Sequence, residues 1–218
     1  MVDIFDEISE DLRADRARAL LARYGGVFLA ACVLVLVGVG AWQIYHQRAD
    51  KENQRVAGRF IAATTEAATA NTAAVRAAAI AQFQDVENQG HPAYTVLARL
   101  DEATLRDDSG DHKGALVLWD QVAGDGSAAP AIRDLAALLW VQHQIDDGDP
   151  ALLAGRLQPL LASTNVWHAL ASEQMALLEV RQGQTAAARE RLQALEIDPT
   201  ASQNVRSRAL TVLASIGG

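Results

Sequence analysis

The segment LARLDEATLRDDSGDHKGALVLWDQV, residues 97–122, decides the fold of this chain. Apolar side chains recur at helical spacing on both sides of a polar turn that contains Gly110. A 3.6-residue period on either side of a glycine turn predicts two helices joined by a short connection. The small residues Ala103 and Ala115 would let the two helices approach closely, and Trp119 would fill the space beside them. We therefore expect a tightly packed helical hairpin.

The same pattern returns twice further along the chain. A Leu-Ala pair precedes each glycine at the same spacing: the leucines are Leu97, Leu135 and Leu170, and the glycines are Gly110, Gly148 and Gly183. The second glycine follows the first by 38 residues, and the third follows the second by 35. Such a period with two helices per unit is typical of an α-solenoid, in which each helix pair buries its apolar face against the next.

This periodicity predicts an all-α chain with a defined order of segments. Residues 46–91 are expected to hold a helical extension and the first helices of the solenoid. Repeats follow at about 92–129, 130–164 and 165–200, and residues 201–218 are expected to form a capping helix. Runs of alternating β-branched residues, the mark of strands, are missing from the sequence.

Two segments resemble the second helix of a tetratricopeptide repeat. They are GDHKGALVLWDQV, residues 110–122, and GQTAAARERLQALEIDP, residues 183–199. The middle repeat departs from that pattern, because Val141 and Leu153 replace the small residues and Pro159 falls within its second helix. The resemblance implies a tetratricopeptide-like solenoid of helix pairs with a degenerate middle unit.

Composition excludes several classes of function. The formal net charge is −8, whereas binding to nucleic acid phosphates requires a Lys/Arg-rich surface. The single cysteine, Cys32, cannot form a disulfide within one chain or a CxxC site. Only 5% of the residues are aromatic, and alanine contributes much of the 50% that are hydrophobic, which favours closely packed helices.

The uncharged stretch GGVFLAACVLVLVGVGAWQIY, residues 25–45, predicts a membrane-spanning helix. As a helix it would be about 32 Å long, close to the hydrocarbon thickness of a bilayer. Val39-x-Ala41 could serve as a signal-peptidase site, but the stretch exceeds the usual ~7–15 apolar residues of a signal peptide. A buried core helix is the third alternative, and core helices seldom stay uncharged for this length.

Residues 1–24 predict a short amphipathic helix ahead of the span, with Ile4, Phe5, Ile8 and Leu12 at helical spacing. Arginines and lysines are balanced on the two sides of the span, so charge alone does not set its orientation. Long domains translocate largely regardless of charge, which favours a cytoplasmic N-terminus and a large domain on the far side.

The opening DIFDEISEDLRADRARALLARYG, residues 3–25, followed by the span, resembles the ancillary subunit family of the SecYEG protein translocon. That resemblance implies a single-pass protein of the bacterial inner membrane with a periplasmic repeat domain. The expected partners are the SecYEG translocon, periplasmic chaperones or exported chains, and the lipid bilayer through residues 25–45. The alternative is a periplasmic scaffold for cell-envelope or cell-division proteins.

A search for chemistry yields no catalytic, cofactor-binding or metal-binding residues. The five histidines are His46, His91, His112, His143 and His168, and none has a second His or Cys at metal-ligand spacing. DDGD at residues 146–149 lacks the spaced ligands of an EF-hand loop and predicts a turn. We therefore expect a protein-binding module rather than an enzyme, without a small-molecule substrate. The repeat pattern does not single out the partner-binding residues.

Overall fold

The structure is a computed structural model that describes residues 34–40, 42–43, 45–47 and 50–217. The chain divides into two compact units, Met1–Gln54 and Arg55–Gly218. In the first unit, the described residues are helical and their side chains are exposed. Every regular element in the described part of the second unit is also a helix, in agreement with the all-α prediction.

The predicted membrane span at 25–45 lies mostly outside the described residues. The same holds for the whole of the predicted amphipathic helix at 1–24. No helix among the described residues combines the length and the apolar character needed to cross a bilayer. The span therefore stays a prediction from the sequence.

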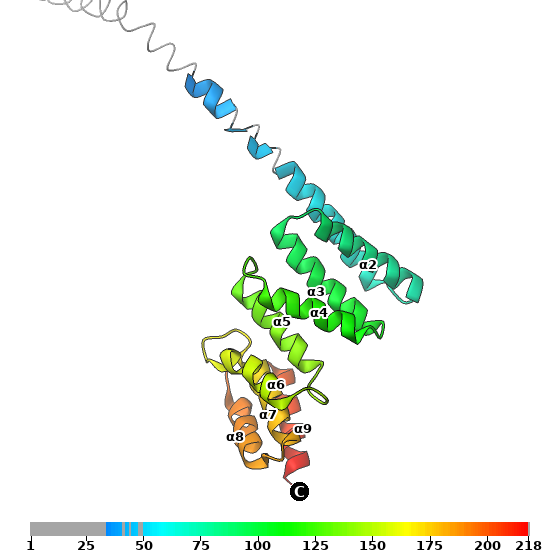
Figure 1. The fold of residues 1–218 in the computed structure, drawn as a ribbon. Helices are drawn as coiled ribbons and strands as arrows, with labels where there is room; N and C mark the ends of the chain where they lie inside the picture. The colour runs from blue at the N-terminus through cyan, green and yellow to red at the C-terminus, as the bar shows by residue number, and fades with distance from the viewer. Residues whose placement is uncertain (1–33, 41, 44, 48–49, 218) are drawn as a thin grey trace, which may run out of the picture. The chain divides into compact units, whose positions relative to one another are not determined.

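The second unit consists of helix pairs followed by a single terminal helix (Figure 1). In chain order the pairs are residues 55–68 with α2 (Ala73–Asn88), α3 (Pro92–Asp108) with α4 (His112–Gly124), α5 (Pro130–Gln142) with α6 (Pro150–Leu157), and α7 (His168–Arg181) with α8 (Thr185–Ile197). A 3-10 turn, η1 (Gln158–Leu161), extends α6, and α9 (Gln203–Ile216) ends the stack. Each labelled helix contacts the next one along the chain, as in a solenoid.

Side chains before several helices fix where those helices begin. The oxygens of Thr72, Asp111, Asp149 and Ser202 accept hydrogen bonds from backbone N–H groups in the first turns of α2, α4, α6 and α9. Helices α3, α5 and α6 begin with a proline, whose missing N–H would be unpaired at that position in any case. Local sequence therefore sets these helix starts.

The glycine turns follow two different geometries. Gly110 and Gly183 have φ of 87° and 74°, where a side chain is disfavoured. The residue after each glycine then closes the helix end with its backbone N–H. Asp111 donates to the Arg106 carbonyl oxygen at 2.9 Å, and Gln184 donates to the Glu179 carbonyl oxygen at 2.8 Å. Gly148 instead lets its own backbone lie close to that of Gln144, because an added Cβ would stand only 2.8 Å from the Gln144 carbonyl oxygen.

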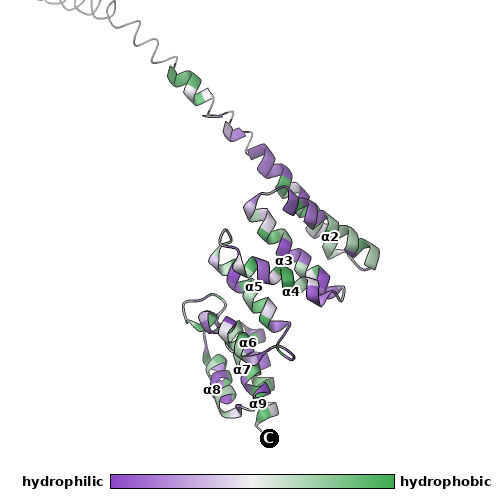
Figure 2. Cartoon of the chain, in the orientation of Figure 1, coloured by the Kyte–Doolittle hydropathy of each residue, from purple (hydrophilic) through white to green (hydrophobic). Residues whose placement is uncertain are grey.

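The second helix of every pair, with the 3-10 turn that extends α6, contributes one repeated side-chain triad to the core, beside buried residues of the first helices such as Leu100 and Leu138. The members of the triad stand at i, i+4 and i+7, and no member is more than 2% exposed. The triads are Ala79, Phe83 and Val86; Ala115, Trp119 and Val122; Leu153, Leu157 and Leu160; and Ala188, Leu192 and Leu195. Hydrophobic and hydrophilic residues consequently alternate along the helices of this unit (Figure 2). Each pair contributes its own piece of one extended core.

The middle pair has the shortest second helix of the labelled ones, and Pro159, expected within that helix, lies just after its α-helical part. The α-helical part of α6 ends at Leu157, and Pro159 lies in the 3-10 turn that follows. Proline has no N–H to bond the carbonyl of Gly155 and cannot continue a regular helix. The chain nevertheless keeps Leu160 in its triad position, 2% exposed.

Candidate functional site

A groove lies where the first helices of the third and fourth pairs meet the terminal helix α9. Helix α5 contacts α7, and α7 contacts α9. The space between them has a volume of about 410 Å³, and we call it the α5–α7–α9 groove. It is lined by Gln142, Ile145, Glu173, Gln174, Leu177, Arg208, Thr211 and Val212. Extended surfaces of this kind are what helical solenoids offer to protein partners.

The groove combines apolar walls with an amide that lacks a partner. Ile145, Leu177 and Val212 supply the apolar contacts. Gln174 is only 8% exposed, and within the part of the chain that the structure describes its Oε1 accepts no hydrogen bond. Leaving a buried acceptor unsatisfied costs free energy, and this oxygen lies beneath the groove surface with almost no exposed area.

One wall of the groove is held by a two-bond ion pair. The guanidinium of Arg208 on α9 donates from Nε to Glu173 Oε1 at 2.5 Å and from Nη2 to Oε2 at 2.6 Å. The Glu173 side chain is 4% exposed, and its hydrogen bonds raise the pKa of Arg208. A planar guanidinium bound through two nitrogens resists rotation, so α9 is held in a defined position against α7.

Hydrogen bonds between neighbouring pairs set the position of α7 against α5. Arg181, at the end of α7, donates to the carbonyl oxygens of Ile145 and Gly148 in the turn after α5. The indole Nε1 of Trp167, just before α7, donates to the Ala131 carbonyl oxygen at 2.7 Å. These contacts anchor both ends of α7 and keep the groove walls in place.

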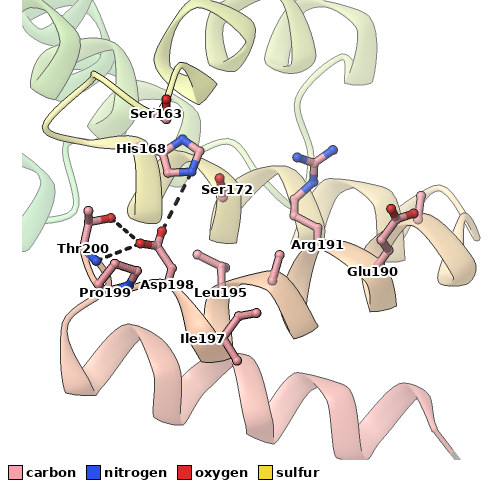
Figure 3. Close-up of a pocket in the computed structure, with 12 residues that line it drawn as sticks. Ser163, His168, Ser172, Glu190, Arg191, Leu195, Ile197, Asp198, Pro199 and Thr200 are labelled. Carbon is pink, nitrogen blue, oxygen red and sulfur yellow. Dashed lines mark hydrogen bonds and ion pairs between the residues drawn. The ribbon is translucent and has the colours of Figure 1, made fainter.

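A second, larger hollow of about 650 Å³ lies beside α7 and α8 (Figure 3). His168 and Asp198 point toward each other there, with Nε2 of the imidazole 3.9 Å from a carboxylate oxygen. The other imidazole nitrogen, Nδ1, lies 2.7 Å from the Leu161 carbonyl oxygen. The Thr200 hydroxyl and backbone N–H both donate to Asp198 at 2.7 Å and lower the pKa of that carboxyl.

The polar groups of this hollow serve the packing of the last repeat. Arg191 is bound to Glu179, with Nη2 donating to Oε1 at 2.7 Å. No hydrogen bond joins His168 to Ser163 or Ser172 among the described residues, so the serines and the imidazole do not form a nucleophile and base pair. The described residues also contain no group of three His, Cys, Asp or Glu side chains placed to hold a metal ion.

Two of the histidines meet at one carboxylate between the second and third pairs. Asp107 lies 2.7 Å from Nδ1 of His112 and 3.1 Å from Nδ1 of His143. The His143 ring is stacked on Trp119, with ring centroids 4.5 Å apart. This cluster joins the end of α3 to the end of α5.

The remaining sequence features occupy structural positions. His46 lies in the first unit, with its ring 4.4 Å from that of Trp42, and His91 precedes the first turn of α3. The segment DDGD, residues 146–149, forms the turn before α6. Its last member, Asp149, accepts a hydrogen bond from the backbone N–H of Leu152 at 3.0 Å.

The residues that line the groove escaped the sequence analysis, although a signal for them was present. Ala176 is the buried small residue of α7, and the groove residues Gln174 and Leu177 stand two before and one after it. The corresponding residues around Ala103 of α3 are Asp101 and Thr104, which line another hollow. The residues two before and one after the buried alanine of a first helix therefore line the hollows in both places.

Comparison with known proteins gives one match. The family described as "Tetratricopeptide repeat-like domain" matches residues 18–138, more than half of the chain. No curated protein and no solved structure matches the chain. The matched region ends within α5, whereas the buried triad continues through α6 and α8.

Proposed function

The chain belongs to the tetratricopeptide repeat-like domain family, and on that premise we propose that it is a membrane-anchored, protein-binding subunit that works beside the SecYEG translocon. Domains of this kind typically act as non-enzymatic interaction scaffolds, because stacked helix pairs present long surfaces without assembling a reactive centre. The partners we propose are the translocon itself and the periplasmic chaperones or exported chains near it.

The α5–α7–α9 groove is the observation that carries the binding function. Its apolar side chains lie beside the buried amide oxygen of Gln174, which has no donor among the described residues. A polypeptide segment supplies apolar side chains that would cover Ile145, Leu177 and Val212. Arg208 and Glu173 hold the wall rigid, so binding requires little reorganisation of the groove.

Residues 25–45 supply the proposed membrane anchor. The stretch is uncharged, and the family match begins ahead of it, at residue 18, so the stretch belongs to the matched region. The opening at residues 3–25 resembles the translocon's ancillary subunit, which supports a cytoplasmic N-terminus, an inner-membrane location and a periplasmic repeat domain.

Photocrosslinking in living cells tests this function. A photoreactive amino acid is placed at Val33 in the proposed anchor, at Thr211 in the groove, and at Val117, which is 57% exposed on the second helix α4, as a matched control. We expect translocon subunits at Val33 and chaperones or exported chains at Thr211, with few adducts at Val117. Adducts with cell-division or cell-wall proteins at the first two positions would contradict the translocon role and favour an envelope scaffold.

A further inference from the structure

A second hollow between first helices has an unusual set of polar groups. It lies between residues 55–68 and α3, has a volume of about 300 Å³, and we call it the α3 hollow. Its apolar surface includes Phe83 and Leu105, and its polar lining consists of Asp101, Asp108, Thr64 and Thr104. The α3 hollow thus combines two carboxyl groups and two hydroxyl groups with an apolar base.

The hydroxyl groups lining the α3 hollow have already used their hydrogens. Thr64 Oγ1 donates to the Ile61 carbonyl oxygen at 2.9 Å, and Thr104 Oγ1 donates to the Leu100 carbonyl oxygen at 3.1 Å. Each hydroxyl oxygen therefore offers only lone pairs to a ligand, and the ionised carboxylates are acceptors as well. A ligand that fits this lining must bring donors, and a positive charge would suit it best.

Asp101 is the group that most needs such a ligand. Its side chain is half-buried, and burial raises the pKa of the carboxyl. No hydrogen bond or ion pair reaches it from any described residue. Burial without a counter-charge disfavours the ionised form and costs free energy of folding.

The chain pairs its more deeply buried carboxylates with cations of its own. Glu102, adjacent to Asp101 in sequence and 2% exposed, accepts from Arg106 Nε at 2.7 Å and from Gln84 Nε2 at 2.9 Å. Glu173 is paired with Arg208 in the same way. No described residue supplies a cation to Asp101, which is less deeply buried and lines the α3 hollow.

The equivalent position two pairs further on is also unsatisfied. Asp101 stands two residues before Ala103, and Gln174 stands two residues before Ala176. Gln174 is 8% exposed, lines the α5–α7–α9 groove and leaves its Oε1 without a donor. The same register of the repeat therefore holds an acceptor oxygen without a donor among the described residues at two places, one lining the α3 hollow and one beneath the surface of the α5–α7–α9 groove.

We propose that the α3 hollow receives the basic side chain of a lysine or arginine on a partner polypeptide, with Asp101 as its counter-ion. The ammonium or guanidinium group bonds the carboxylate, and the alkyl stem packs on Ala67 and Ala68, which line the hollow and are accessible. This inference rests on the proposed protein-binding function and specifies the charge of the partner. A bare metal ion suits the apolar base less well, because it requires several oxygen ligands around it.

A titration of the full chain in detergent micelles tests the α3 hollow directly. The probes are N-acetyl-lysine methylamide and its uncharged counterpart N-acetyl-norleucine methylamide, followed by NMR through the methyl signals of Thr64 and Thr104. We expect saturable binding of the lysine probe, weakened at least about tenfold by Asp101→Asn. Asp146→Asn removes the same charge from an exposed turn outside the hollow and should leave binding unchanged.

Three results of this titration would overturn the proposal. The first is that the norleucine probe binds as tightly as the lysine probe. The second is that the Asp101→Asn variant binds the lysine probe as tightly as the unmodified chain does. The third is that Mg²⁺ saturates the hollow at a lower concentration than the lysine probe does.

Crosslinking in cells separates this proposal from the proposed function. A photoreactive residue at Ala68, exposed beside the α3 hollow, should give a partner adduct that falls about tenfold with Asp101→Asn, while adducts at Thr211 persist. Adducts at Ala68 that survive Asp101→Asn would refute the hollow and leave the protein-binding function standing. If the chain without the Asp101→Asn change gives no partner adduct at Ala68 or at Thr211, the proposed function is contradicted. The lysine titration would then still show whether the α3 hollow binds a basic side chain.

Discussion

Two neighbouring acids in α3 show how much the surroundings of a single residue decide. Glu102 is buried between Arg106 and Gln84, whereas Asp101 faces a hollow in which no described residue pairs with it. Both are acids in the same helix, and their sequence positions differ by one. Helix geometry turns successive side chains by about 100°, so one joins the interior and the next meets the hollow.

Replacing Asp101 by Asn should stabilise the fold at neutral pH. Burial raises the folded-state pKa of Asp101 above its unfolded value, so the protonated form favours folding and this contribution is lost as pH rises through the raised pKa. The advantage of Asp101→Asn should therefore grow from pH 3 to pH 7 and then level off. Urea unfolding at several pH values measures it, and an equal effect at pH 3 and pH 7 would exclude the burial argument.

Replacing Gly110 by Ala should destabilise the fold by about 1–2 kcal/mol, because its φ of 87° is costly for any residue with a Cβ. Gly155→Ala is the matched control, since Gly155 lies inside α6 with open space around its Cα. That change should be neutral or stabilising by up to about 1 kcal/mol. Thermal and urea unfolding compare the two, and similar losses in both would contradict the role of the turn.

At the scale of elements, both helices of a pair supply the core, and the second helices do so through one recurring triad. The buried triads recur in α2, α4, α6 and α8. The α3 hollow lies beside the first helices of two pairs, and the α5–α7–α9 groove lies between two first helices and the terminal helix α9. Both follow from stacking, in which each pair buries one face against its neighbours and leaves another face free.

Replacing Trp119 by Ala should cost about 3–5 kcal/mol, because the indole is 1% exposed at the centre of its triad. The control on the same helix is Val117→Ala, at a side chain that is 57% exposed, and it should change stability by less than about 0.5 kcal/mol. The free energy of unfolding in urea distinguishes them. A loss below about 1 kcal/mol at Trp119 would refute the triad as the core.

Replacing Arg208 by Leu should loosen α9, because it leaves the buried Glu173 carboxylate without its cation. We expect a loss of about 2 kcal/mol or more, with part of it recovered when Glu173→Leu is added, since the unpaired charge is then removed. Hydrogen exchange in residues 203–216 reports the loosening directly. A double variant that loses as much as the sum of the two single ones would contradict the coupling.

At the scale of the whole molecule, the repeat unit has its own core. The unit Arg55–Gly218 contains the four clusters of buried residues in the described chain, and each cluster is formed within that unit. Domains with a core of their own can fold independently. The sequence before it is proposed to hold the unit at a membrane.

Deleting residues 1–45 should release the repeat unit from the membrane without unfolding it. The shortened chain should appear in the soluble fraction of a cell extract and unfold in urea in a single cooperative step. The full chain, extracted with detergent only, is the control. A shortened chain that aggregates or unfolds without cooperativity would contradict a self-sufficient repeat unit.

Periodicity alone determined the class and order of the elements. The spacing of Gly110, Gly148 and Gly183, and the small residues near them, predicted helix pairs, and Pro159 predicted the irregular middle unit. These features act locally: a glycine is tolerated at positive φ, and a proline lacks an N–H, whatever surrounds them. The triad of the first pair, Ala79 with Phe83 and Val86, follows the same rule and was missed because alanine is abundant throughout that segment.

Only the tertiary structure decided which polar groups remain unpaired. Asp101, Glu102 and Gln174 look equally ordinary along the chain, and their partners come from helices distant in sequence or are missing among the described residues. An ion pair such as that of Glu173 with Arg208 depends on how two pairs stack, which no local pattern encodes. Helix formation depends on neighbours along the chain, whereas a binding surface depends on the groups that packing leaves over.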